Sequence, residues 1–126
     1  MTAPPYQPAP RTWIAKFRDA FRGIYVGACA QSSFAVHLIV SALVIALAAY
    51  LAVDLIRWSL LLLCIALVLA AELFNSAIEW LAKAIDHGEN ENLRNALDVA
   101  SGAVLVTSIG AAIVGGLIFA ERLAAM

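Results

Sequence analysis

Three polar side chains interrupt an otherwise apolar stretch in the middle of the chain. Glu72, Asn75 and Glu79 are separated by three and then four residues, so on an α-helix they project from one face. A carboxylate inside a membrane costs about 3 kcal/mol or more unless it is compensated. Glu79 and Asp86 also lie toward the C-terminal end of the same segment, where the helix dipole disfavours anions. The spacing therefore predicts a cation beside this face, either a metal ion or a basic side chain.

The kind of cation can be narrowed from the donor atoms. Carboxylate and amide oxygens without cysteine or clustered histidine favour a hard ion such as Mg²⁺, which binds one or two carboxylates together with substrate phosphates. Lys83 and Arg94 lie nearby in sequence and could contact phosphates, although basic residues beside a span more often anchor the topology or bind headgroups. The pattern indicates phosphate chemistry at one membrane face.

A purely structural interpretation of the same residues stays open. Glu72 and Asn75 could hydrogen-bond between helices while Glu79 reaches interfacial water. His37 and His87 are isolated in the sequence and are interpreted as a polar helix contact and a loop residue. No P-loop, Gly-rich kinase loop, HExxH or GxSxG motif is present, so soluble kinase and hydrolase templates do not apply.

Composition places the chain in the membrane. Of its 126 residues, 63% are hydrophobic and 13% are charged, with a formal net charge of -1. That apolar content exceeds what one domain of this size can bury in a core, and the charge gives no field suited to nucleic acid. Cys29 and Cys64 lie among apolar residues and are predicted to form neither a disulfide nor a metal site.

The elements that must position the polar face follow from hydropathy and helical periodicity. We predict a disordered Pro-rich tail over 1–10 and one all-α integral membrane domain over 11–126. Its predicted elements are an amphipathic surface helix over 11–30 and three membrane spans, over 34–53, 58–80 and 97–120. Trp58 and Trp80 would lie about 33 Å apart on one helix, close to the bilayer thickness, and mark its two interfaces.

The surface helix and the loops set the expected orientation. Aromatic residues recur at helical spacing in 11–30, opposite a basic stripe of Arg11, Arg18 and Arg22, which suits a helix lying on an anionic leaflet. Basic residues gather before the first span and around the 81–98 loop, whereas Arg57 and Arg122 stand alone on the other side. The N-terminus is therefore predicted to be cytoplasmic, and the C-terminus periplasmic or external, in a bacterial inner membrane.

One face of the third span carries small residues. Ser108, Ala112 and Gly116 repeat every four positions, a spacing that lets helices approach closely in lipid. It favours a packed bundle and an oligomer.

Four segments resemble one known family. The run from Glu72 to Glu79, ELFNSAIE, resembles the signature of the prokaryotic diacylglycerol and undecaprenol kinases. The segments at 98–104 (DVASGAV), 20–23 (AFRG) and 34–37 (FAVH) resemble other motifs of that family. The resemblance covers about residues 15 to 120 without a gap.

The resemblance implies a fold and an activity. Members are homotrimers of three-span subunits with a surface helix, and they transfer the γ-phosphate of MgATP to a lipid hydroxyl at cytoplasmic sites between subunits. By this resemblance Glu72 would be the general base, and Asn75 would help to arrange the catalytic site. The ATP-binding residues would be Glu79, Asp98, Lys83 and Gln31, of which Glu79 and Gln31 would hold Mg²⁺.

The chain departs from the family pattern around the phosphate site. Gln31 replaces a metal-binding Glu, Leu97 replaces a Lys, Lys83 replaces an Asp and Ser33 replaces an Asn. Lys83 lies one turn beyond Glu79 and could supply the missing cation.

These observations leave two functions from different classes. The first is a kinase that phosphorylates diacylglycerol or undecaprenol. The second is a kinase-fold protein that has lost catalysis and serves as a structural or lipid-binding partner subunit. A transporter is disfavoured because no internal repeat is found.

Overall fold

The computed structural model describes residues 2–85 and 88–126 and is entirely helical over its regular elements. The described residues form α1 (Trp13–Ala30), α2 (Ser32–Tyr50), α3 (Leu55–Ile85) and α4 (Glu91–Ala124). Asp86 and His87 lie outside the described residues, so the structure carries no information on the interpretations made for them. The predicted all-α class with an N-terminal helix before three spans is confirmed.

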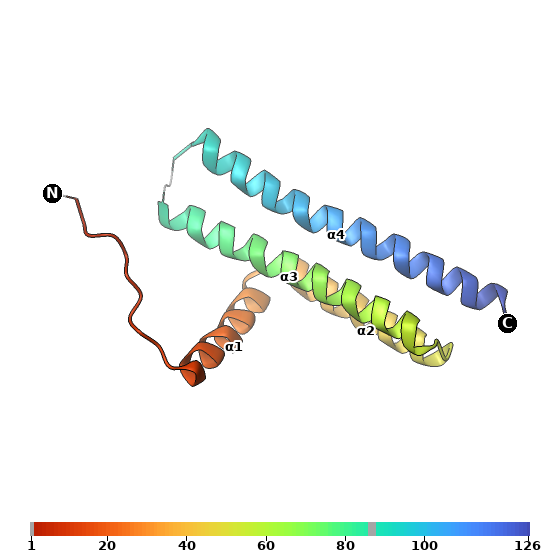
Figure 1. Cartoon of the computed structure of the whole chain (residues 1–126). Coiled ribbons are helices and arrows are strands. Elements are labelled where there is room, and N and C mark those ends of the chain that lie inside the picture. The colour runs from red at the N-terminus through yellow and green to blue at the C-terminus, as the bar shows by residue number, and fades with distance from the viewer. Residues whose placement is uncertain (1, 86–87) are drawn as a thin grey trace.

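Helices α2, α3 and α4 are each long and apolar enough to cross a membrane. They lie side by side as a bundle, and α1 crosses it at an angle (Figure 1). Helices α3 and α4 run antiparallel and extend past the start of α2, so their joined ends project beyond the rest of the bundle (Figure 1). We call the end of the bundle where α3 ends and α4 begins the Glu79 end. The opposite end, which contains the α2–α3 turn and the C-terminus of α4, is called the Arg57 end.

The helices are not coextensive with the predicted spans. The second and third spans, predicted over 58–80 and 97–120, belong to the longer helices Leu55–Ile85 and Glu91–Ala124. The first, predicted over 34–53, belongs to a helix that ends at Tyr50. Hydropathy marks where side chains suit lipid, whereas backbone hydrogen bonding continues into polar sequence until a cap ends it. At α4 that cap is Asn90, whose side chain accepts from the backbone N–H groups of Asn92 and Leu93.

Helix α1 begins two residues later than predicted. The Thr12 hydroxyl accepts from the backbone N–H of Ala15 at 3.2 Å and caps the helix at Trp13. Arg11 therefore precedes the helix and pairs with Asp19 at 2.8 Å instead of extending the basic stripe. Phe17 and other large apolar side chains of α1 are exposed, as expected for a helix that rests on a membrane surface.

Helix α1 approaches α3 most closely at one small residue. Gly27 is the buried residue of α1, and a Cβ atom at this position would lie 2.7 Å from the Leu73 side chain. The absence of a side chain lets the two helices approach closely beside the polar face of α3.

The Arg57 end is tied together by ion pairs. Arg57 pairs with Asp54 at 2.7 Å and with Glu121 at 2.6 Å. Arg122 donates to the backbone oxygen of Leu51 at 2.7 Å. The two arginines that stand alone in the sequence thus join the α2–α3 turn to the C-terminal end of α4.

This end should become less stable in acid. The backbone N–H of Arg57 donates to Asp54 and, with the guanidinium, holds the pKa of that carboxyl below its ordinary value. A folded-state pKa below the unfolded one stabilises the protein at neutral pH, and this contribution is lost as the pH falls through the folded pKa. We expect Asp54→Asn to remove this part of the acid sensitivity. Melting temperatures in detergent micelles from pH 7 down to pH 3 should fall less for the variant than for the wild type, and parallel curves would contradict the assignment.

Candidate functional site

The polar face of α3 points toward the beginning of α2. Glu72 is 2% exposed and Asn75 is 7% exposed, so both are buried within a single chain. The neighbouring Ser76 is buried as well. The spacing of these residues along α3 aligns them over about two turns of helix, next to the junction between α1 and α2.

Glu72 is held by two side chains from the first turns of α2. The Ser33 hydroxyl donates to Oε2 at 3.2 Å, and Nε2 of His37 lies 2.9 Å from Oε1. Ser33 and His37 are four residues apart, so one face of α2 presents both. His37 is therefore a polar contact between helices, as interpreted from sequence. Its partner, Glu72, was not predicted, although the i, i+4 spacing of Ser33 and His37 was a signal that both could face the polar residues of α3.

Glu79 belongs to a separate hydrogen-bond network. Gln31, between α1 and α2, donates its side-chain amide to Oε2 of Glu79. Asn75 donates to Oε1 at 3.1 Å from one turn earlier on α3. The side-chain oxygen of Asn75, Oδ1, is buried and has no hydrogen-bond partner among the described residues. The Glu79 network thus ends in an acceptor that a cation or a donor could satisfy.

These atoms can be compared with what Mg²⁺ requires. Among the described residues no group of three or more His, Cys, Asp or Glu is close enough to hold a metal. Mg²⁺ nevertheless needs only one or two carboxylates when substrate phosphates and water complete its shell. Glu79 supplies one carboxylate, Asn75 supplies the unpaired oxygen, and a half-turn of the Gln31 amide would present its oxygen instead of its nitrogen. The donor set fits an ion shared with phosphates.

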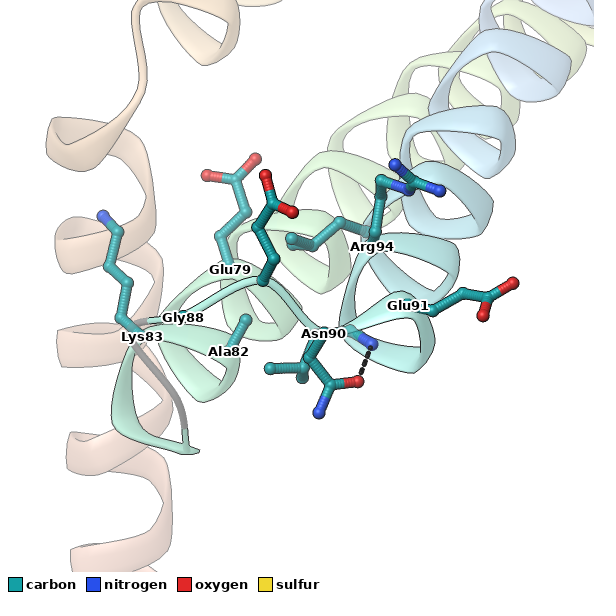
Figure 2. Close-up of a pocket in the computed structure, with 10 residues that line it drawn as sticks. Glu79, Ala82, Lys83, Gly88, Asn90, Glu91 and Arg94 are labelled. Atoms are coloured by element: carbon teal, nitrogen blue, oxygen red, sulfur yellow. Dashed lines mark hydrogen bonds between the residues drawn. The ribbon is translucent and has the colours of Figure 1, made fainter.

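A cavity of about 690 Å³ opens beside Glu79, between the end of α3 and the start of α4 (Figure 2). Its walls include Lys83 and Leu97 and the segment from Gly88 to Glu91. Leu97 places an apolar side chain in this wall. Asp98 is exposed on α4 and does not line the cavity, so a single chain brings Glu79 and Lys83, but not Asp98, to this site.

The two cations of the cavity wall differ in their surroundings. The ammonium of Lys83 lies 5.2 Å from the centre of the Trp80 ring, a cation–π contact. Arg94 makes no ion pair with any described residue. Figure 2 shows Lys83 reaching toward α1 and Arg94 on α4, with Glu79 between them. Arg94 is one turn before Leu97 on the same helix and also lines the cavity.

A second cavity, of about 370 Å³, lies between α2, α3 and α4 and is mostly apolar. His37 borders it, as do Ser108, Ala112 and Gly116, the small residues of the third span. A Cβ atom added at Gly116 would have no neighbour within 4 Å. Within one chain this face of α4 leaves space and does not form the close helix contact that its spacing predicted.

The fold and the site together define a class of protein. The chain is a multi-pass membrane protein with one buried, hydrogen-bonded carboxylate, Glu72, in an apolar helix, and with a cavity beside a second carboxylate, Glu79. The family model for prokaryotic diacylglycerol kinase matches residues 18–119, which include every site residue from Gln31 to Asp98. The chain belongs to the prokaryotic diacylglycerol kinase family and is a multi-pass bacterial membrane protein.

One curated relative is a diacylglycerol kinase from Synechocystis sp., 34% identical over 112 residues. The match covers 88% of this chain and 63% of that relative. The chain thus spans less than two thirds of the length of the curated relative it matches.

Proposed function

We propose that this protein is a lipid kinase that transfers the γ-phosphate of ATP to the hydroxyl of a membrane lipid. Diacylglycerol and a polyprenol such as undecaprenol are the two acceptors we consider. The observation that carries the proposal is Glu72, a carboxylate that is 2% exposed yet fixed by hydrogen bonds within a membrane-spanning helix. Such a group is costly in lipid and is typically functional. Membership of the kinase family supports the same conclusion.

Glu72 would act on the acceptor. Its carboxylate accepts the proton of the lipid hydroxyl as the hydroxyl oxygen forms a bond to the γ-phosphorus. The bond between that phosphorus and the oxygen bridging to the β-phosphate breaks, and ADP leaves. Because both oxygens of Glu72 are already anchored by Ser33 and His37, the base is held in one orientation before the substrate arrives.

Glu79 would act on the nucleotide. Glu79, Asn75 and Gln31 would hold Mg²⁺, which neutralises charge on the transferred phosphoryl group when it is bound. The cavity beside Glu79, with Lys83 and Arg94 in its wall, would take the polyphosphate. Phosphoryl transfer needs mainly positioning and charge neutralisation, and these residues provide both without a nucleotide-binding lobe.

We further propose a homotrimer with the Glu79 end in the cytoplasm. Many large apolar side chains of the spans are exposed in the single chain, so lipid or neighbouring subunits must cover them. Asp98 is exposed on α4 and would complete the ATP site of a neighbouring subunit. A cytoplasmic Glu79 end agrees with the basic residues gathered there and places the cavity where ATP is available.

The proposal is tested with purified protein in lipid micelles. The protein is given Mg²⁺, γ-labelled ATP and either diacylglycerol or, in a separate assay, undecaprenol. Label in one lipid identifies the acceptor. Absence of label in both, from a folded oligomer, contradicts the kinase proposal.

A non-catalytic partner subunit is the second candidate. It is favoured by the Gln31 amide, which satisfies Glu79 without a metal, and by Leu97 in the cavity wall. The buried Glu72 weighs against it, because a scaffold gains nothing from a costly carboxylate beyond helix packing. Nucleotide binding separates the two, since a scaffold need not bind MgATP.

The two cations should contribute unequally to ATP binding. Arg94 has no competing ion pair with a described residue, whereas Lys83 contacts Trp80. A guanidinium on phosphate also forms charge-assisted, often bidentate hydrogen bonds. We expect Arg94→Gln to raise KM for ATP about tenfold, equivalent to about 1.4 kcal/mol, and Lys83→Gln to raise it less. Initial rates against ATP at saturating lipid measure both, and a larger effect at Lys83 would place the phosphates on the α1 side of Glu79.

A further inference from the structure

His37 has a position that its isolation in the sequence does not suggest. Its Nε2 atom lies 2.9 Å from Oε1 of Glu72, and the Ser33 hydroxyl donates a hydrogen bond to Oε2 of the same carboxylate at 3.2 Å. The two donors come from adjacent turns of α2 and bind different oxygens of one carboxylate. A glutamate side chain has three rotatable bonds, and anchoring both of its oxygens selects one conformation.

The imidazole of His37 lies between a buried carboxylate and a cavity. Its side chain is 23% exposed, whereas that of Glu72 is 3% exposed. The ring borders the apolar cavity between α2, α3 and α4. The Nε2 atom is directed to the carboxylate, and the residue also contributes to the cavity wall. No other described titratable group forms an ion pair or hydrogen bond with Glu72.

We propose that His37 is a positioning residue for phosphoryl transfer, which orients the Glu72 carboxylate toward the acceptor hydroxyl. The inference rests on the proposed function, in which Glu72 is the base. His37 acts through Glu72, and among the described residues it takes no part in the hydrogen-bond network of the nucleotide side, where Glu79 binds Gln31 and Asn75. Its removal should therefore reduce the rate of the chemical step and leave the affinity for ATP unchanged.

The test compares two substitutions at the same position. His37→Leu removes the donor and keeps an apolar side chain, and a misplaced catalytic group costs about 10²-fold in kcat. His37→Gln keeps an N–H donor of similar reach and should retain kcat within about tenfold. KM for ATP should stay at the wild-type value in both. Thr107→Val is the matched control, because it removes a polar group from a span where the hydroxyl, among the described residues, bonds backbone oxygens of its own helix, and it should leave kcat unchanged.

A second measurement reads the contact without activity. The imidazole nitrogen resonances of His37 are recorded in ¹⁵N-labelled protein in micelles, with His87→Gln used to assign them. Glu72→Gln should shift the Nε2 resonance because it replaces the carboxylate that the ring binds. An unshifted resonance, or equal kcat in the leucine and glutamine variants, overturns the inference. An inactive wild type instead refutes the kinase function itself, so the two failures are distinct.

Discussion

Glu72→Gln is expected to lower kcat by about 10³-fold while the protein remains folded. A general base contributes about 10² to 10⁴ in rate, and the amide cannot accept the hydroxyl proton. The amide is of similar size and can still bond the Ser33 hydroxyl, which donates to the carboxylate in the wild type. A neutral side chain is also less costly in a membrane than an ionised one, so the melting temperature should not fall.

The measurement combines the lipid phosphorylation assay with a thermal melt of the same preparation. Glu121→Gln is the control, because it neutralises a carboxylate that pairs with Arg57 at the opposite end of the bundle. It should keep its activity. A Glu72→Gln protein with activity close to the wild-type rate would exclude Glu72 as the base, and one that is inactive because it is unfolded would show low stability in the melt.

Glu79→Gln is expected to weaken Mg²⁺ and reduce kcat/KM for ATP by about 10²-fold. The change leaves two amides, at positions 31 and 79, where the wild type has one amide and one carboxylate. A site without an anion holds a hard divalent cation poorly, and charge neutralisation at the phosphates is lost with it. The half-saturating Mg²⁺ concentration should rise by at least tenfold.

The chain offers a swap as the matched control for this variant. Gln31→Glu combined with Glu79→Gln restores one carboxylate and one amide to the same pair, with the charge on the other side chain. We expect the double variant to recover most of the lost Mg²⁺ affinity. Mg²⁺ titrations of the phosphorylation rate compare the three proteins, and a swap as defective as the single variant would argue that the metal is not held by this pair.

The class of this protein is readable from its sequence because it depends on local chemistry. Hydropathy alone identifies three segments that suit lipid, since the membrane selects apolar side chains over about 20 residues. Helical periodicity alone places Glu72, Asn75 and Glu79 on one face. The ELFNSAIE run then leads to the family, which the match over residues 18–119 confirms. Each of these features can be recognised without knowledge of how one helix packs on another.

The contacts of the site depend on that packing. The rotation and register of α2 and α3 determine which residues of α2 face Glu72. These residues are Ser33 and His37. The same register brings Gln31 to Glu79 and leaves Asp98 on an exposed face of α4. Sequence spacing cannot supply these pairings, because a helix of given periodicity can turn any face toward its neighbour.

The small residues and the arginines show the same division. Their spacing predicts that Ser108, Ala112 and Gly116 share one face of a helix, and they do line one cavity. That this face borders a cavity depends on how the three helices pack together. Likewise, the sequence determined that Arg57 lies just beyond the first span, but its partner Glu121 is 64 residues away. Local chemistry determined what each segment is, and long-range packing decided what each side chain meets, because packing energies depend on surfaces that form only when the helices come together.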